Sequence, residues 1–208
     1  MKKILFTLAI LPFLMVSKVS HAVDFTVGVT TGAFVGYAHG RETTDGGDIN
    51  TEGAFLVENS SQAFAEIDMG RVSVGVEYMF TGIETPENKS EKDLNTQKVE
   101  LENLVIGYVA LDVAGGFYVK AGLASGDLAT LETMGSSSQS GSNVEDQSLD
   151  GVSGAIGYIS EFDNGVQLRG EWIYTEYDNL QHTDSTGDAY AVNDLTSSRV
   201  SIGIAKKF

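Results

Sequence analysis

Residues 164–175 of the sequence read Asn-Gly-Val-Gln-Leu-Arg-Gly-Glu-Trp-Ile-Tyr-Thr. The Asn-Gly pair is favoured in the tight turns that join antiparallel strands. After this pair the side chains alternate, with Val166, Leu168, Trp172 and Tyr174 on one parity and Gln167, Arg169, Glu171 and Thr175 on the other. Because successive side chains of a strand point to opposite faces, the alternation predicts a strand with one apolar and one polar face.

The same alternation occurs along most of the chain. It is clear in residues 25–37, in residues 72–80 and in the last ten residues, where Val200, Ile202 and Ile204 alternate with Arg199, Ser201 and Gly203. The stretch Leu104–Leu111 is apolar on both parities. The acids that flank this stretch, Glu100, Glu102 and Asp112, set its predicted register.

Short turn signals divide the chain after residue 22 into four intervals of roughly 45 residues, each long enough for two strands and a loop. The turns are Met69–Arg71, Val113–Gly116 and Asp163–Gly165. Each interval contains one polar segment, and these are Arg41–Thr51, Glu84–Gln97, Met134–Gln147 and Asp178–Asn193. Four hairpins with short turns at one end and long loops at the other predict an all-β, eight-stranded antiparallel up-and-down transmembrane barrel with periplasmic turns and extracellular loops.

The N-terminus has the composition of a secretory signal. Met1–Lys3 is basic, Ile4–Val16 is apolar apart from Thr7 and Pro12, and Ser20–Ala22 ends in a small residue. We expect cleavage after Ala22, which makes residues 1–22 a signal peptide and residues 23–208 the barrel domain. A membrane anchor is the alternative, but the apolar run is shorter than the ~20 residues of a spanning helix.

Composition excludes several classes of function. The chain has no cysteine and a formal net charge of −16. Loss of Lys2, Lys3 and Lys18 with the signal leaves 10 basic residues against 29 acidic residues. A surface this acidic argues against nucleic-acid binding and against adhesion to anionic lipid.

Aromatic residues on the apolar parity cluster at two levels of the predicted strands. Phe25, Phe117 and Phe208 lie near the turns or termini, and a second group lies 8 to 13 residues further along the strands. In a tilted strand this separation corresponds to ~25 Å, the height of the lipid-facing band of an outer-membrane barrel. We therefore expect two aromatic girdles, made of Phe25, Tyr37, Tyr78, Phe80, Phe117, Trp172 and Tyr174.

The pattern resembles the small outer-membrane β-barrel family of Gram-negative bacteria typified by OmpX, the OmpA barrel and the opacity-type porins. The stretches that carry the resemblance are Phe117–Leu123, Gly154–Tyr158, Asn164–Trp172 and Ser201–Phe208. The resemblance implies location in the outer membrane and a role in adhesion, envelope stability or small-molecule passage. It also implies that Phe208, a terminal aromatic, is the assembly signal for the barrel-assembly machinery. Lys206 departs from this terminal pattern, which usually has an apolar residue there.

Charged residues on the polar parity are too costly to face lipid, so we expect them inside the barrel. The predicted interior network is Glu66, Asp68, Glu77, Glu100, Glu102, Asp112, Lys120, Glu161, Arg169, Glu171 and Arg199. An eight-stranded barrel is just wide enough for side chains to fill it, so we predict a plugged, polar lumen with trapped water. The acids outnumber the bases, so some carboxylates should be hydrated, protonated or near a mouth.

Enzyme chemistry and cofactors are not expected. His39 and His182 are the histidines that remain after the signal, and neither belongs to a recognisable catalytic motif. Acidic residues in the first and fourth polar segments are spaced too loosely for a defined calcium loop.

The function hypothesis is a non-enzymatic surface barrel. Its loops would contact an unknown extracellular ligand, and its wall would contact outer-membrane lipid and lipopolysaccharide. A narrow channel for small or hydrophobic molecules and a lipid A-modifying enzyme remain as alternatives.

Overall fold

The computed structural model describes residues 23–43, 47, 49–85, 88–89, 96–133, 147–183 and 189–208. The predicted signal peptide, residues 1–22, lies outside this part of the chain. Across the described residues, no helix has the length and apolar character that crossing a membrane requires.

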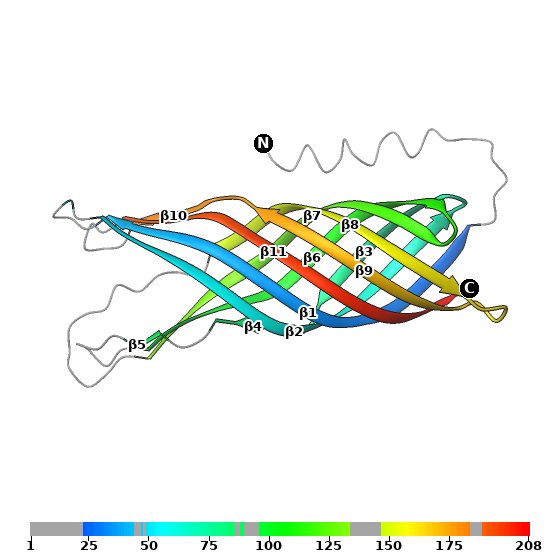
Figure 1. The fold of residues 1–208 in the computed structure, drawn as a ribbon, viewed down its shortest axis with the longest axis horizontal. Helices are drawn as coiled ribbons and strands as arrows, with labels where there is room; N and C mark the ends of the chain where they lie inside the picture. Colours follow the sequence, from blue (N-terminus) through cyan, green and yellow to red (C-terminus); the bar gives the residue numbers. More distant parts are fainter. Residues whose placement is uncertain are drawn as a thin grey trace.

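The described residues form a closed antiparallel β-barrel (Figure 1). Its strands are β1 (Asp24–Thr43), β2 (Ile49–Met69), β3 (Val72–Met79), β4 (Ile83–Glu84), β5 (Asn88–Lys89), β6 (Thr96–Ala114), β7 (Phe117–Thr133), β8 (Gln147–Glu161), β9 (Val166–Tyr177), β10 (Leu180–Thr183) and β11 (Ala189–Lys207). The short strands β4 and β5 pair with β6, as β3 does, and β10 pairs with β11, as β9 does. The wall therefore has eight strand positions, closed by pairing of β1 with β11, as the sequence predicts.

The three short turns lie where they are predicted. Gly70, Gly115, Gly116 and Gly165 have φ values of 78°, 62°, 86° and 76°, which a residue without a Cβ adopts freely. We call this end of the barrel the turn end and the opposite end the loop end. The first polar segment is mostly strand rather than loop, because β1 continues to Thr43 and β2 begins at Ile49. Backbone pairing does not require apolar side chains, so the hairpin extends past the apolar part of the wall.

The strand registers determine the stagger of the barrel. A path of directly paired residues that starts at Phe55 in β2 and passes once around the wall returns to β2 at Ala65, ten residues nearer the turn end. The path runs through Tyr37, Thr196, Glu176, Val152, Leu123, Gly107 and Val76. Eight strands with this stagger tilt by roughly 40° to the barrel axis.

The outer face carries an apolar band. Val74, Leu168 and Ile202 are exposed on it, as their parity predicts. The seven aromatic residues predicted for the girdles are also exposed on this face, and each has more than 40% of its surface accessible. Such a surface fits lipid, with aromatic rings near its edges.

The stagger places Tyr37 beyond this band rather than at its edge. The path described above descends toward the turn end from Phe55 through Tyr37 and Thr196 to Glu176. Glu176 is an exposed carboxylate on the outer face, so it marks a level outside the apolar band. Tyr37 and the exposed Phe55 and Val57 lie further toward the loop end and form an outer apolar patch.

Candidate functional site

The candidate site is the barrel lumen, where most of the predicted interior charges meet. Its turn-end half contains a charged network, and its loop-end half contains an apolar cluster. The alternation of the strands places both sets, because the residues that face inward have the parity opposite to the apolar band.

Four of the charged residues form a closed ring of ion pairs. Lys120 Nζ lies 2.9 Å from Glu77 Oε2 and 2.8 Å from Glu171 Oε1. Arg199 binds the other oxygen of Glu77 and lies 3.6 Å from Glu171 Oε1. Every member has less than a tenth of its side chain exposed. The ring therefore compensates two buried negative charges with two positive ones.

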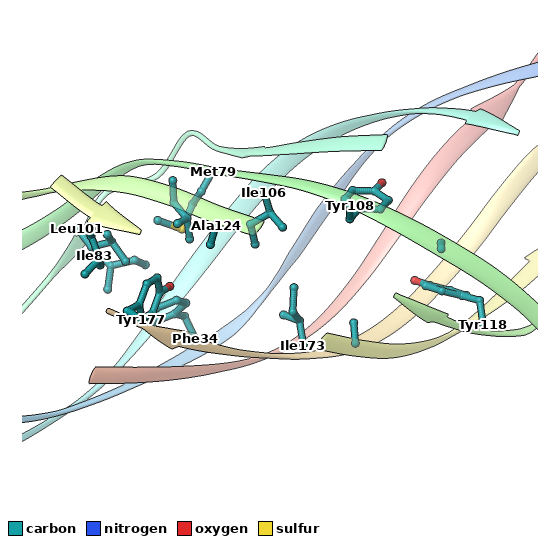
Figure 2. Packing of buried hydrophobic residues seen from close by; sticks show 14 residues of the cluster. Phe34, Met79, Ile83, Leu101, Ile106, Tyr108, Tyr118, Ala124, Ile173 and Tyr177 are labelled. Atoms are coloured by element: carbon teal, nitrogen blue, oxygen red, sulfur yellow. The ribbon is translucent and has the colours of Figure 1, made fainter. Parts of the chain in front are cut away.

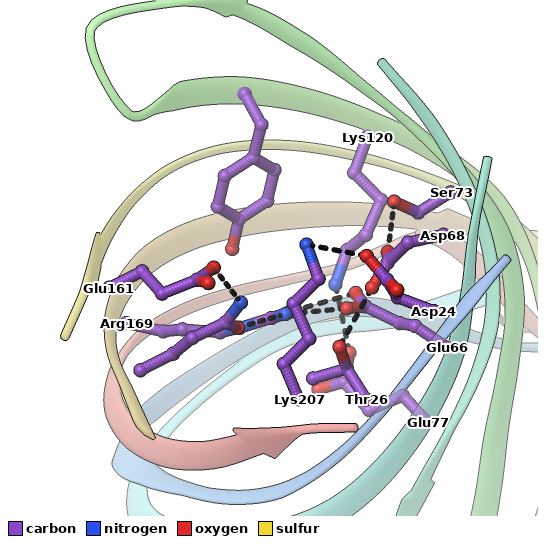
Figure 3. A network of polar contacts seen from close by, with 12 residues as sticks. Asp24, Thr26, Glu66, Asp68, Ser73, Glu77, Lys120, Glu161, Arg169 and Lys207 are labelled. Carbon is purple, nitrogen blue, oxygen red and sulfur yellow. Dashed lines mark hydrogen bonds and ion pairs between the residues drawn. The ribbon is translucent and has the colours of Figure 1, made fainter. Parts of the chain in front are cut away.

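A second ion pair crosses the lumen nearer the turn end (Figure 3). Arg169 Nη1 and Nη2 donate to the two oxygens of Glu66 at 2.8 and 2.5 Å, the bidentate geometry expected for an arginine in the lumen. Arg169 also donates to the side-chain oxygen of Gln167, whose amide donates to Glu161 at 2.8 Å.

Two inward tyrosines connect the acids to the wall. Tyr108 donates to Glu66 at 2.8 Å, and Tyr118 donates to Glu171 at 2.7 Å. Lys120 Nζ also lies 4.3 Å from the centre of the Tyr108 ring. The carboxylates are thus held by hydroxyl donors as well as by cations, which lowers the cost of burying them.

The remaining predicted interior acids lie at the mouth of the turn end. Asp68, Asp112 and Glu161 border a cavity of about 340 Å³ together with Lys207. Asp68 accepts hydrogen bonds from Thr26 and Ser73 at 2.7 and 2.6 Å. The buried network is balanced, with three carboxylates and three cations, and the excess acid lies beside a mouth, one of the placements expected for it.

The prediction that Glu100 and Glu102 face the lumen is wrong. Leu101 between them is buried in the lumen, so the two acids have the outward parity. The cause is a β-bulge between Glu102 and Val105, where Asn103 has a φ of 54°. An extra residue in one strand exchanges the inward and outward parities beyond it.

The loop-end half of the lumen corrects the prediction of a polar interior throughout. An apolar plug fills it (Figure 2), made of Phe34, Met79, Ile83, Leu101, Leu104, Ile106, Leu149, Ile173 and Tyr177. All of these side chains are buried. Sequence reasoning missed the plug, although Ile173 and Phe34 stand on the polar parity of their strands and are signals for it.

The histidines and the loop acids bear on catalysis and metal binding. His39 lies in β1 opposite Asn193, just after an irregularity in the pairing. Within the described ranges, no three residues among His, Asp and Glu are placed to hold a metal ion. Asp184 and Asp188 of the fourth polar segment lie outside those ranges. His182 belongs to β10, and only its backbone is described.

No family model and no curated protein matches this sequence. Solved structures do match it. The outer-membrane protein OprG of Pseudomonas aeruginosa has a TM-score of 0.60 at 14% identity, with 90% of this chain and 96% of that chain covered. The outer-membrane protein AlkL in lipid bilayers has a TM-score of 0.58 at 13% identity, with 92% and 93% covered. At these identities the similarity establishes the fold, that of small outer-membrane β-barrels.

Proposed function

We propose that this chain is an outer-membrane surface protein without enzymatic activity, whose barrel has no continuous water path. The filled lumen carries this proposal. An ion or a small polar solute that enters at the turn end meets the ring of Glu77, Lys120, Glu171 and Arg199, and beyond it the apolar plug. Both barriers are built from buried side chains, and they lie in series.

The turn end faces the periplasm in this proposal, and the loop end faces the outside. Short turns on the periplasmic side and longer excursions outside are the pattern of outer-membrane barrels. The apolar band contacts membrane lipid, and polar residues at the level of Glu176 contact the headgroup region of lipopolysaccharide. Phe208 directs the exported chain to the barrel-assembly machinery, and the loop end contacts an extracellular ligand.

A narrow conduit for small hydrophobic molecules is the second candidate function. The apolar lining of the loop-end half favours it, since side chains such as Phe34, Met79 and Ile173 would not repel such a molecule. The charged ring argues against it, because an apolar molecule gains nothing on passing buried ion pairs. A lipid A-modifying enzyme built on His39 or His182 is the third candidate, and mass spectrometry of lipid A from cells with and without the gene tests it.

Single-channel recording in planar bilayers tests the main proposal. Refolded full-length protein, with folding verified by heat-modifiable gel mobility, is expected to insert without steady openings. Steady cation-selective openings in most insertions would overturn the proposal. Uptake of a hydrophobic dye tests the conduit. We expect the dye to enter vesicles that contain the protein at the same rate as it enters empty vesicles. A comparison of adhesion, serum sensitivity and phage sensitivity between deletion and wild-type strains tests the surface role.

A further inference from the structure

Toward the loop end, one edge of β2 has no strand partner among the described residues. On one side β2 pairs with β1 along its whole length, from Ile49 to Asp68. On the other side it pairs with β3 only from Gln62 to Met69. The short strand β4, which follows β3, pairs with β6, and no described strand pairs with residues 49–60 of β2 on this side. We call residues 49–60 the open edge. In Figure 1 the β1–β2 hairpin and the end of the wall that contains β5 and β6 diverge at the left.

The backbone of the open edge presents its hydrogen-bonding groups away from β1 at every second residue. Ser61 marks the direction, because its carbonyl accepts from the Phe80 N–H at 3.2 Å and its own N–H donates to Thr81 Oγ1 at 2.9 Å. Backbone groups alternate in direction along an antiparallel strand. The N–H and C=O groups of Asn59, Val57 and Phe55 therefore point to the same side as those of Ser61, where β3 no longer runs.

The two faces of the open edge differ in chemistry. Val57 and Phe55 point outward and are 57% and 65% exposed. Glu58 has the inward parity, as shown by its position opposite the buried Phe34, yet its side chain is exposed. A strand added here would place alternate side chains beside apolar groups and beside a carboxylate.

The open edge also lies outside the apolar band. Open sheet edges do not occur in the hydrocarbon region of a membrane, because unpaired backbone groups are too costly there. The stagger of the barrel places Phe55 and Val57 nearer the loop end than the exposed carboxylate of Glu176. An aqueous partner can therefore reach this edge, and a lipid chain gains nothing from it.

We propose that the open edge of β2 binds an extended peptide segment of a partner protein by strand addition, and that this segment alternates cationic and apolar residues. Main-chain hydrogen bonds to an exposed edge supply affinity in such complexes, and alternate side chains supply specificity. The charge of the partner follows from the exposed carboxylate of Glu58 and from the chain's net charge of −16. The same charge disfavours a second copy of this chain as the occupant. The inference rests on the proposed surface function and names its site and partner class.

A designed peptide tests the proposal directly. The probe is a fluorescein-labelled octapeptide of alternating lysine and valine, titrated against full-length protein refolded in detergent micelles and followed by fluorescence anisotropy. The comparison peptide is N-methylated on alternate residues, which keeps the charge and removes the donors of one edge. We expect the unmodified peptide to bind at least about tenfold more tightly, since several backbone hydrogen bonds are lost in the other. Equal binding of the two peptides would overturn the proposal, because it would show charge attraction alone.

Protein variants locate the site. Val57→Pro removes an N–H that points to the open edge and is expected to weaken binding by about tenfold, whereas Val57→Ala keeps the N–H and should weaken it much less. Glu58→Gln is expected to weaken binding several-fold, and Glu176→Gln, which removes an exposed carboxylate on another part of the wall, should have no effect. If Val57→Pro fails to fold, the N-methylated peptide and Glu58→Gln still decide the question. If the peptide does not bind and the bilayer recordings show no openings, the edge proposal alone is refuted. Steady openings in the bilayer recordings would instead refute the proposed function.

Discussion

Glu77 is the residue on which the buried ring depends most, because it binds both Lys120 and Arg199. The change Glu77→Gln preserves the shape of the side chain and removes its charge. The ring then holds two cations and one carboxylate in a site with only a few per cent exposure. Two charge-assisted hydrogen bonds are weakened, each contributing about 1.5–3 kcal/mol, which agrees with the ~3–5 kcal/mol typical of breaking a buried ion pair.

Urea titration of protein refolded into lipid vesicles measures this loss in the free energy of unfolding. Glu102→Gln is the matched control, since Glu102 lies on the outward parity, and it should change stability by less than about 0.5 kcal/mol. Adding Lys120→Met to Glu77→Gln restores the balance of charge, so the double variant should lose less than the sum of the single variants. A Glu77→Gln variant as stable as the control, or strictly additive losses, would refute the view that charge balance in the ring stabilises the barrel.

Three further predictions concern the wall. Gly75→Ala places a Cβ 2.6 Å from the ring of Tyr108 on the paired strand and should lower the free energy of unfolding by about 1–3 kcal/mol in urea titration. The Cβ of Gly170→Ala meets nothing within 4 Å, so this variant should be as stable as the wild type. Ile202→Lys puts a charge on the apolar band and should cost ~2–4 kcal/mol, more than Ser73→Lys at the rim of the turn-end cavity; equal costs would reject the register. Deletion of Phe208 should lower the folded yield in outer-membrane fractions, by heat-modifiable mobility, far more than it lowers the stability of protein refolded in vitro; normal yield in cells would contradict its role as an assembly signal.

The sequence was sufficient for the turns and for the outward face of the wall, because both depend on local chemistry. Gly70 and Gly165 mark turns through their own conformational freedom, and Leu168 and Ile202 mark the outer face through parity alone. Parity alone does not show how much space the lumen leaves for a side chain. Ser201 has the polar parity but is only 3% exposed, so a lysine there would meet a filled interior rather than water.

The pairing in the lumen could not be predicted, because it depends on the stagger of the whole barrel. Arg169 and Arg199 lie on neighbouring strands, yet Arg169 binds Glu66 across the lumen rather than an acid beside Arg199. The bulge at Asn103 has the same non-local character. The apolar plug explains why Leu104–Leu111 is apolar on both parities: residues such as Ile106 enter the plug, while Val105 and Val109 face the apolar band.

The ring of ion pairs has a consequence for the order of folding. Its members come from β3, β7, β9 and β11, so the last cation, Arg199, arrives only when the final strand has entered the wall. Closure by β1 and β11 joins residues as distant in sequence as Thr26 and Lys207. A partly inserted chain would expose uncompensated carboxylates at membrane depth, which is far costlier than exposing them in water. Insertion should therefore be concerted, with a transition state in which the first and last strands are already close and few stable intermediates in the bilayer.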